Sequence, residues 1–157
     1  MEFEKAKKIA AKLISFKMYT MDEVYKKLIQ KGISTEVAEQ TVAEFCKAGI
    51  LNDEEYAKAY IHDGLLVNMK GAFRIKQELI QKGIASSIIE KALKDTEIDE
   101  ASVLEEYVRI RFDGKFFSDW KEIEKAKAHL ARRGFGLYEI NKCFENLGIK
   151  VVRGEDD

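Results

Sequence analysis

The 157-residue chain contains no proline, only two cysteines and only two histidines. Without proline its turns must depend on glycine, which is common in helix-rich proteins. Cys46 and Cys143 are too few for a disulfide framework and lack a CxxC spacing, so we expect reduced thiols. His62 and His129 each stand alone, without a second ligand at metal-binding spacing. The sequence therefore predicts no metal site and no cofactor.

Long apolar runs and an excess of one charge are also missing. No segment reaches 18 uncharged apolar residues, and the N-terminus lacks the apolar stretch of a secretion signal, so we expect a cytoplasmic protein without a membrane partner. The formal net charge of −1 excludes a globally basic nucleic-acid-binding protein. No glycine-rich phosphate loop is present, and neither cysteine has a histidine nearby, so we predict no enzymatic activity. The apolar fraction of 46% is sufficient for a buried core.

One hexapeptide recurs at a fixed interval. LIQKGI occupies 28–33 and 79–84, and LARRGF occupies 130–135, so that Gly32, Gly83 and Gly134 are 51 residues apart each time. A glycine just past the last turn of a helix adopts a left-handed conformation that other residues avoid. The apolar residue that follows the glycine then packs on the residue four positions before the glycine, as Ile33 can do on Leu28. Each copy therefore predicts a helix end, with a new helix after it.

Apolar residues at helical spacing precede and follow each of these ends. Thr20 with Glu23, Asn52, and Ser118 are candidate caps for helix starts. The fold class that we predict is all-α, with three tandem three-helix repeats forming an elongated, curved array. The modules lie at about 1–49, 50–97 and 98–150 of a single domain at 1–150, followed by a short, disordered acidic tail at 151–157. We expect a monomer.

Basic residues recur on one face of the middle helices. Lys70 and Arg74 lie opposite the apolar stripe in the second module. A shift of 51 residues gives Lys121 and Lys125, and Arg132 lies further along the same face. Basic residues beside two of the glycines are predicted to extend this stripe. We call the whole set the basic ridge: Lys70, Arg74, Lys82, Lys121, Lys125, Arg132 and Arg133. Such a ridge can meet phosphates or an acidic protein surface, and a solvated helix face is the alternative interpretation.

Two other interpretations of these patterns are weaker. A helix followed by a glycine and a second helix also suggests a helix-turn-helix DNA-binding motif. The candidate recognition helix at 33–46, however, carries three glutamates and no lysine or arginine to contact DNA. Exposed aromatic residues can stack on single-stranded bases, whereas aromatics at this spacing usually lie in the core between modules. Phe116 and Phe117, in a predicted loop beside Lys115, are the best candidates for an exposed pair.

Three segments carry a family resemblance: GILNDEEYAKAYI at 49–61, GAFRIKQELIQKGI at 71–84 and HLARRGF at 129–135. In this order they resemble the RecX family, whose members regulate the RecA recombinase. The resemblance covers nearly the whole chain and implies three tandem three-helix repeats. It implies a cytoplasmic, non-enzymatic modulator that acts in recombination, DNA repair and the SOS response.

The implied partner is the RecA filament, bound typically in its helical groove. Single-stranded DNA, contacted through its phosphates, is a further partner that the basic ridge suggests. Such binding lowers ATP hydrolysis and strand exchange or promotes filament loss. The alternatives are a helical protein–protein scaffold and a weak, non-specific DNA-binding protein, neither of which regulates a recombinase. The salt dependence of binding separates them, because phosphate contacts weaken steeply with salt.

Overall fold

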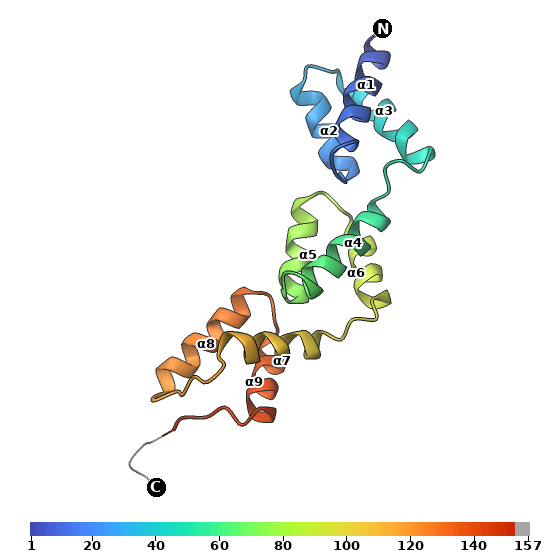
Figure 1. Ribbon diagram of the computed structural model, residues 1–157. Helices are drawn as coiled ribbons and strands as arrows, with labels where there is room; N and C mark the ends of the chain where they lie inside the picture. The colour runs from blue at the N-terminus through green and yellow to red at the C-terminus, as the bar shows by residue number, and fades with distance from the viewer. Residues whose placement is uncertain (153–157) are drawn as a thin grey trace. The chain divides into compact units, whose positions relative to one another are not determined.

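The computed structural model describes residues 1–152, which fold into α-helices joined by short turns (Figure 1). In chain order the helices of this part are α1 (Glu2–Ile14), α2 (Met21–Gln30), α3 (Thr35–Lys47), α4 (Asp53–Leu66), α5 (Ala72–Gln81), α6 (Ser86–Asp95), α7 (Glu100–Arg111), α8 (Trp120–Arg132) and α9 (Leu137–Asn146). The predicted all-α helical repeat is confirmed. The chain forms two compact units, one from 1–60 with 78–95 and the other from 61–77 with residues from 96 onward.

Side-chain caps fix where the helices begin. Thr20 and Glu23 form the predicted capping box at the start of α2. Asn52 Oδ1 accepts the Glu55 amide at the start of α4, at 3.1 Å. The predicted cap of α8 was wrong by one residue: Asp119, not Ser118, caps this helix. Asp119 presents a carboxylate to the orphan amide of Glu122 at 2.9 Å, and the Ser118 amide instead donates to the Glu122 side chain.

The three repeated hexapeptides end their helices in the same way. Gly32, Gly83 and Gly134 have φ values of +88°, +86° and +103°. The amide of the next residue donates to the carbonyl five positions back, from Ile33 to Leu28 at 3.0 Å and equivalently in the other copies. Both apolar residues of each pair are buried. This backbone bond and the apolar contact that accompanies it are typical of a helix that ends at glycine. The predicted helix ends are therefore confirmed in all three copies.

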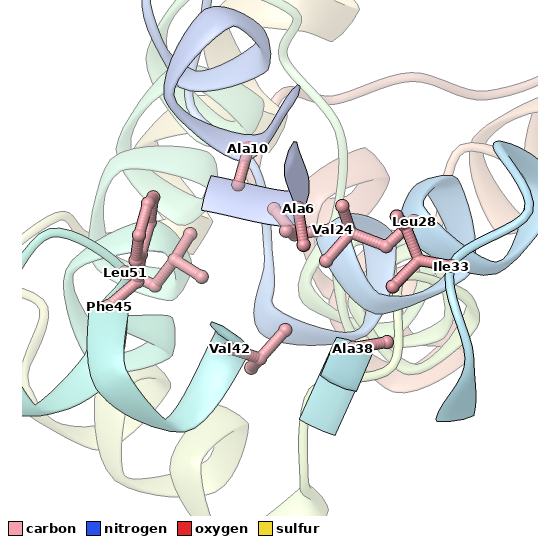
Figure 2. Packing of buried hydrophobic residues seen from close by; sticks show 9 residues of the cluster. All are labelled: Ala6, Ala10, Val24, Leu28, Ile33, Ala38, Val42, Phe45 and Leu51. Carbon is pink, nitrogen blue, oxygen red and sulfur yellow. The ribbon is translucent and has the colours of Figure 1, made fainter. Parts of the chain in front are cut away.

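The core of the first module shows how short side chains bring helices close (Figure 2). Ala6 and Ala10 of α1 are fully buried. They belong to one buried cluster with apolar residues of α2 and α3 and of the turns that follow: Val24, Leu28, Ile33, Ala38, Val42, Phe45 and Leu51. In the third module Cys143 is buried, as its position in the repeat predicted, and burial raises the pKa of its thiol.

The end of the described chain pairs with the loop before α8. Phe117 and Val151 form an isolated parallel bridge, and the Val152 amide donates to the Phe117 carbonyl at 2.9 Å. The tail expected to be disordered from residue 151 thus begins with two paired residues, and its remainder, 153–157, lies outside the described residues. Within the described chain, every helix is too short or too polar to cross a lipid bilayer.

Candidate polyanion-binding surface

In the first compact unit, the glycine turn after α5 packs on the start of α2. The Thr20 hydroxyl is fully buried; it donates to the Lys82 carbonyl at 2.7 Å and accepts the Glu23 amide at 3.1 Å. The Met21 amide donates to the Asp53 carboxylate at 3.0 Å. Two of the first amides of α2, which have no partner within their own helix, are therefore satisfied: that of Glu23 by the cap Thr20 and that of Met21 by Asp53 of α4.

Lys82, a predicted ridge residue, is part of this junction. Its ammonium lies 3.6 Å from Glu23 and over the rings of Tyr56 and Tyr60, at 6.0 and 5.6 Å from their centroids. Burial opposes its charge, but the Tyr56 hydroxyl and the Glu23 carboxylate outweigh burial and raise the pKa of Lys82. This lysine joins helices within the unit, and its charge is balanced locally.

In the second compact unit, the glycine turn after α8 packs on the start of α5 in an equivalent way. The Gly71 amide donates to the Arg133 carbonyl at 2.8 Å, and the Phe73 amide donates to the Gly134 carbonyl at 3.2 Å. The carbonyl end of α8 therefore satisfies the amide end of α5, an arrangement that also aligns the two helix dipoles favourably.

A carboxylate completes each of these two junctions. The Ala72 amide, between the two just described, donates to the Glu100 side chain at 2.9 Å, as the Met21 amide does to Asp53. Asp53 and Glu100 are the first residues of α4 and α7, respectively. Burial raises the pKa of both carboxylates. Neither acid was predicted as a site residue, because its role in the junction depends on a contact 32 (Asp53) or 28 (Glu100) residues away in the chain.

Arg133 holds the loop before α5. Its guanidinium donates to the Met69 carbonyl through Nε at 3.2 Å and Nη2 at 3.1 Å, and Nη2 also donates to the Asn68 carbonyl. It lies 4.4 Å from the centroid of the Tyr107 ring. Met69 has a left-handed φ of +50°, a strained conformation that these bonds help to maintain. Arg133 thus fixes the segment that carries Lys70 and Arg74.

The other ridge residues lie around this junction and along α8. The half-buried Arg74 is brought against the α8 turn, because a Cβ built on Gly134 would lie 2.5 Å from the Arg74 backbone nitrogen. Lys121, Lys125 and Arg132 are exposed on the face of α8 opposite its buried stripe. Within residues 1–152, no carboxylate oxygen lies within 4.0 Å of the charged nitrogens of these three side chains. Their charge is therefore open to an anionic partner.

The structure adds a histidine and an arginine that the sequence analysis missed. His129 Nε2 lies 2.7 Å from the Tyr107 hydroxyl, and the two rings are stacked. Burial lowers the pKa of His129, and so do the charges of Arg111, Arg133 and Arg132. Arg111 ends α7, the first helix of its module, whereas the basic stripe was predicted on the middle helices alone.

The exposure of several aromatic side chains differs from the prediction. Phe117 is buried at 2% exposure against Phe112 and Phe144, whereas Phe116, beside it in an extended segment, is 77% exposed. Phe73 and Trp120 are two of the aromatic residues whose helical spacing predicted a place in the core, yet they are 66% and 65% exposed. Both lie in the first turn of a helix, on the outer side. That expectation was wrong because apolar spacing alone does not tell a core face from an exposed first turn.

Comparison with known proteins places this geometry in a family. Residues 6–45 match the first three-helix domain of RecX, and residues 52–93 match the second. The regulatory protein RecX of Streptococcus sanguinis (strain SK36) is 32% identical over 151 residues, which cover 95% of this chain and 58% of that protein. The chain therefore spans little more than half the length of this relative. The regulatory protein RecX of Caldanaerobacter subterraneus subsp. tengcongensis is 33% identical, with 90% of this chain and 70% of that protein covered.

A solved structure agrees in fold. The crystal structure of RecX from Lactobacillus salivarius superposes with a TM-score of 0.79 at 24% identity, covering 94% of this chain and 97% of that chain. Sequence identity above 30% to RecX proteins and the match to both three-helix domains lead to one conclusion: the chain belongs to the RecX family.

Proposed function

We propose that this chain regulates the RecA recombinase, binding the RecA–single-stranded DNA filament and lowering ATP hydrolysis and strand exchange. The observation that carries the proposal is the match to both RecX three-helix domains, in relatives that are named regulatory proteins. In this proposal the modules at 1–49, 50–97 and 98–150 act as one binding domain. The protein works as a monomer in the cytoplasm, without catalysis of its own.

The basic ridge supplies the contact in this mechanism. Lys121, Lys125 and Arg132 project from one face of α8, and the junction at Arg133 and Gly134 joins the end of this helix to the start of α5. Both the DNA phosphates and acidic protein surfaces in a filament attract such a face. The bulk of the bound helices then hinders nucleotide turnover or the addition of subunits.

The direct test is ATP hydrolysis by RecA from the same organism on single-stranded DNA, with this protein titrated in. Inhibition at substoichiometric amounts supports action at filament ends or loss that spreads along the filament. Inhibition that needs near-equal amounts supports occupancy along the groove. An unchanged rate at saturating protein contradicts the proposal and favours a helical scaffold with another protein partner.

Charge reversal tests the ridge itself. The variant K121E/K125E/R132E changes exposed residues only, so we expect its helicity to match that of the wild type while inhibition falls at least tenfold. The matched control is K5E/K8E/K12E, which makes the same total charge change on exposed positions of α1. If the two variants lose inhibition equally, net charge and not the ridge explains the effect.

The sequence alone suggested Arg74 with Lys125 and Arg132 for such a test. The structure favours Lys121 in place of Arg74, because the Arg74 backbone packs on Gly134 and a change there can disturb the junction. Circular dichroism and urea unfolding of both triple variants show whether they fold. A loss of inhibition in a folded α8 variant, but not in the α1 variant, supports the ridge.

A further inference from the structure

Exposed apolar side chains gather at the start of α9, in the second compact unit. Phe73, Leu137 and Tyr138 are 66%, 64% and 72% exposed. A Cβ built on Gly136, the cap residue of α9, would lie 3.4 Å from Cε2 of Phe73, so the Phe73 ring lies beside the first turn of α9. We call Phe73, Leu137 and Tyr138 the apolar patch. Groups of exposed apolar side chains are typical of surfaces that bind another protein.

The other modules carry polar residues where this module carries the patch. The repeat places Asp22 and Glu124 at the position of Phe73, and Thr35, Glu36, Ser86 and Ser87 at those of Leu137 and Tyr138. The helices α3 and α6 begin with these polar residues, so folding of the module does not require apolar side chains there. The patch therefore needs an explanation other than the stability of the repeat.

The apolar patch continues into a hollow between α7 and α9. The hollow has a volume of about 140 Å³, and its lining includes Lys142, whose Nζ lies 6.0 Å from the centroid of the Tyr138 ring. The buried residues Leu104 and Cys143 also line it. Pockets for small molecules usually measure about 300 Å³ or more. A hollow of this size is suited to a single apolar side chain of a partner.

Carboxylates flank the apolar patch on two sides. The Glu139 carboxylate lies against the same turn as Phe73, since its Oε2 would overlap a Cβ on Gly136. Glu100 accepts the amide of the residue before Phe73 at 2.9 Å, and Asp99 beside it is exposed. Burial raises the pKa of Glu100, and the nearby charges of Glu139 and Asp99 raise it further. We call Asp99, Glu100 and Glu139 the acidic rim.

The acidic rim decides which class of partner fits. Among the residues that the structure describes, no lysine or arginine nitrogen lies within 4.0 Å of the carboxylates of Asp99 or Glu139. Arg74, which follows Phe73, already has an interaction within the chain. Carboxylates repel phosphates, so exposed rings with such neighbours are unsuited to a nucleic-acid strand. Apolar side chains flanked by lysine or arginine are complementary to both the patch and its rim.

An amphipathic helix presents such side chains together. Its apolar residues recur every three or four positions on one face, and its basic residues can border that face. Helices of this kind commonly bind in a groove between two helices of another protein. The hollow between α7 and α9, with the apolar patch at the start of α9, has this form.

We infer that the apolar patch and the hollow between α7 and α9 form a docking site for a basic amphipathic helix of a protein partner. The site goes beyond the proposed function, because it is a second face of the chain, opposite in charge to the basic ridge. Binding at this site requires neither DNA nor a recombinase, and it is tested without them.

The first measurement is fluorescence anisotropy of a labelled synthetic peptide of leucine and lysine, arranged to form an amphipathic helix, with the full chain. The variant F73S/L137S/Y138S removes the patch, leaves every charge in place and gives α9 the two serines with which α6 begins, Ser86 and Ser87. Loss of three apolar anchors is expected to weaken binding of the peptide by about tenfold or more.

The matched control is L66S/V67S/F116S. It removes three other apolar side chains of the same unit, which are 51%, 72% and 77% exposed. The control is expected to bind the peptide as the wild type does. Circular dichroism shows whether both variants keep the helicity of the wild type.

Charge complementarity has its own test. The variant D99N/E139Q removes two charges of the acidic rim and keeps a cap residue for α7, because asparagine caps a helix as aspartate does. It is expected to weaken binding of the lysine peptide at low salt and to have little effect at high salt, where exposed charges are screened. A peptide with glutamate in place of each lysine is expected not to bind the wild type.

NMR of the wild type locates the bound peptide without any substitution. The amide of Gly136, beside Phe73, is expected to shift on addition of the lysine peptide. The amide of Gly32, in the first unit, is expected to keep its position.

Four results overturn the inference. One is equal affinity of the peptide for the wild type and for F73S/L137S/Y138S. Another is a Gly136 amide that does not shift at saturating peptide. The third is equal binding of the lysine and glutamate peptides. The fourth is self-association of the wild type in sedimentation that is lost in F73S/L137S/Y138S and not reversed by the peptide, which assigns the patch to a second copy of the chain.

The ATP hydrolysis assay separates this inference from the proposed function. Binding of the peptide at the patch by a protein that has no effect on RecA leaves the docking site standing and refutes the regulatory proposal. Inhibition of RecA by a protein that does not bind the peptide refutes the docking site and leaves the regulatory proposal intact.

Discussion

Replacing Gly32, Gly83 and Gly134 by alanine, one at a time, places the same change at three equivalent helix ends with different surroundings. All three have positive φ, so each alanine meets backbone strain of the same kind. At Gly32 the added Cβ meets nothing within 4 Å. At Gly83 it would lie 2.3 Å from the Asp22 Cβ, and at Gly134 it would lie 2.5 Å from the backbone nitrogen of Arg74. The three variants therefore separate two contributions to the lost free energy of unfolding: the left-handed backbone of the alanine and the overlap of its Cβ with a packed junction.

The expected losses follow from these contacts. An alanine held in the left-handed region costs about 1–2 kcal/mol, and its smaller unfolded-state entropy returns about 0.4–1 kcal/mol, so G32A is expected to lose about 1 kcal/mol. Overlap in a packed junction adds about 1–3 kcal/mol at Gly83. At Gly134 the overlap is with backbone, which cannot rotate away. Displacing this turn also weakens the bonds from the Gly71 and Phe73 amides, at about 1 kcal/mol each, for a total of about 4–6 kcal/mol.

Urea unfolding followed by circular dichroism gives the free energy of unfolding for each variant. Hydrogen exchange then locates the loss, because the Gly71 and Phe73 amides are expected to lose protection in G134A and to keep it in G32A. A loss for G134A no larger than that for G32A would refute the reasoning, since it would mean that the turn after α8 does not pack on α5.

Two further predictions concern the start of α2. D53N keeps an acceptor for the Met21 amide, whereas D53A leaves that amide unpaired at a cost of about 1–3 kcal/mol, a difference that urea unfolding measures. Burial raises the pKa of Asp53, so its contribution to stability is present while it is protonated and is lost as the pH rises through the raised value. Stability measured from acidic to neutral pH is expected to lack this fall in D53N, and an identical pH profile would contradict it. T20V removes both a cap and the buried bond to the Lys82 carbonyl, so it is expected to cost about 2–3 kcal/mol. S34A removes a cap and only an exposed bond to the Glu2 carboxylate, so it is expected to cost about 1 kcal/mol.

Helix ends and most helix starts could be predicted from the sequence because their interactions are local. The clasp from Leu28 to Ile33 spans five positions, and the box of Thr20 and Glu23 spans three. Both use residue types that few other local structures favour, so their recurrence every 51 residues was enough to predict the helical repeat. The same local reasoning placed Lys121, Lys125 and Arg132 on one exposed face, since helical periodicity decides which side chains share a face.

The roles of the residues beside the glycines were decided only by tertiary structure. Lys31, Lys82 and Arg133 occupy the same position in the three copies, and nothing in their local sequence separates them. Lys31 is exposed, Lys82 pairs with Glu23, and Arg133 binds carbonyls 64 and 65 residues away. The contact between Tyr107 of α7 and His129 of α8 depends in the same way on tertiary packing. Sequence periodicity determines the faces of single helices, whereas contacts between segments far apart in the chain determine which charges are neutralised in a junction and which remain open to a partner.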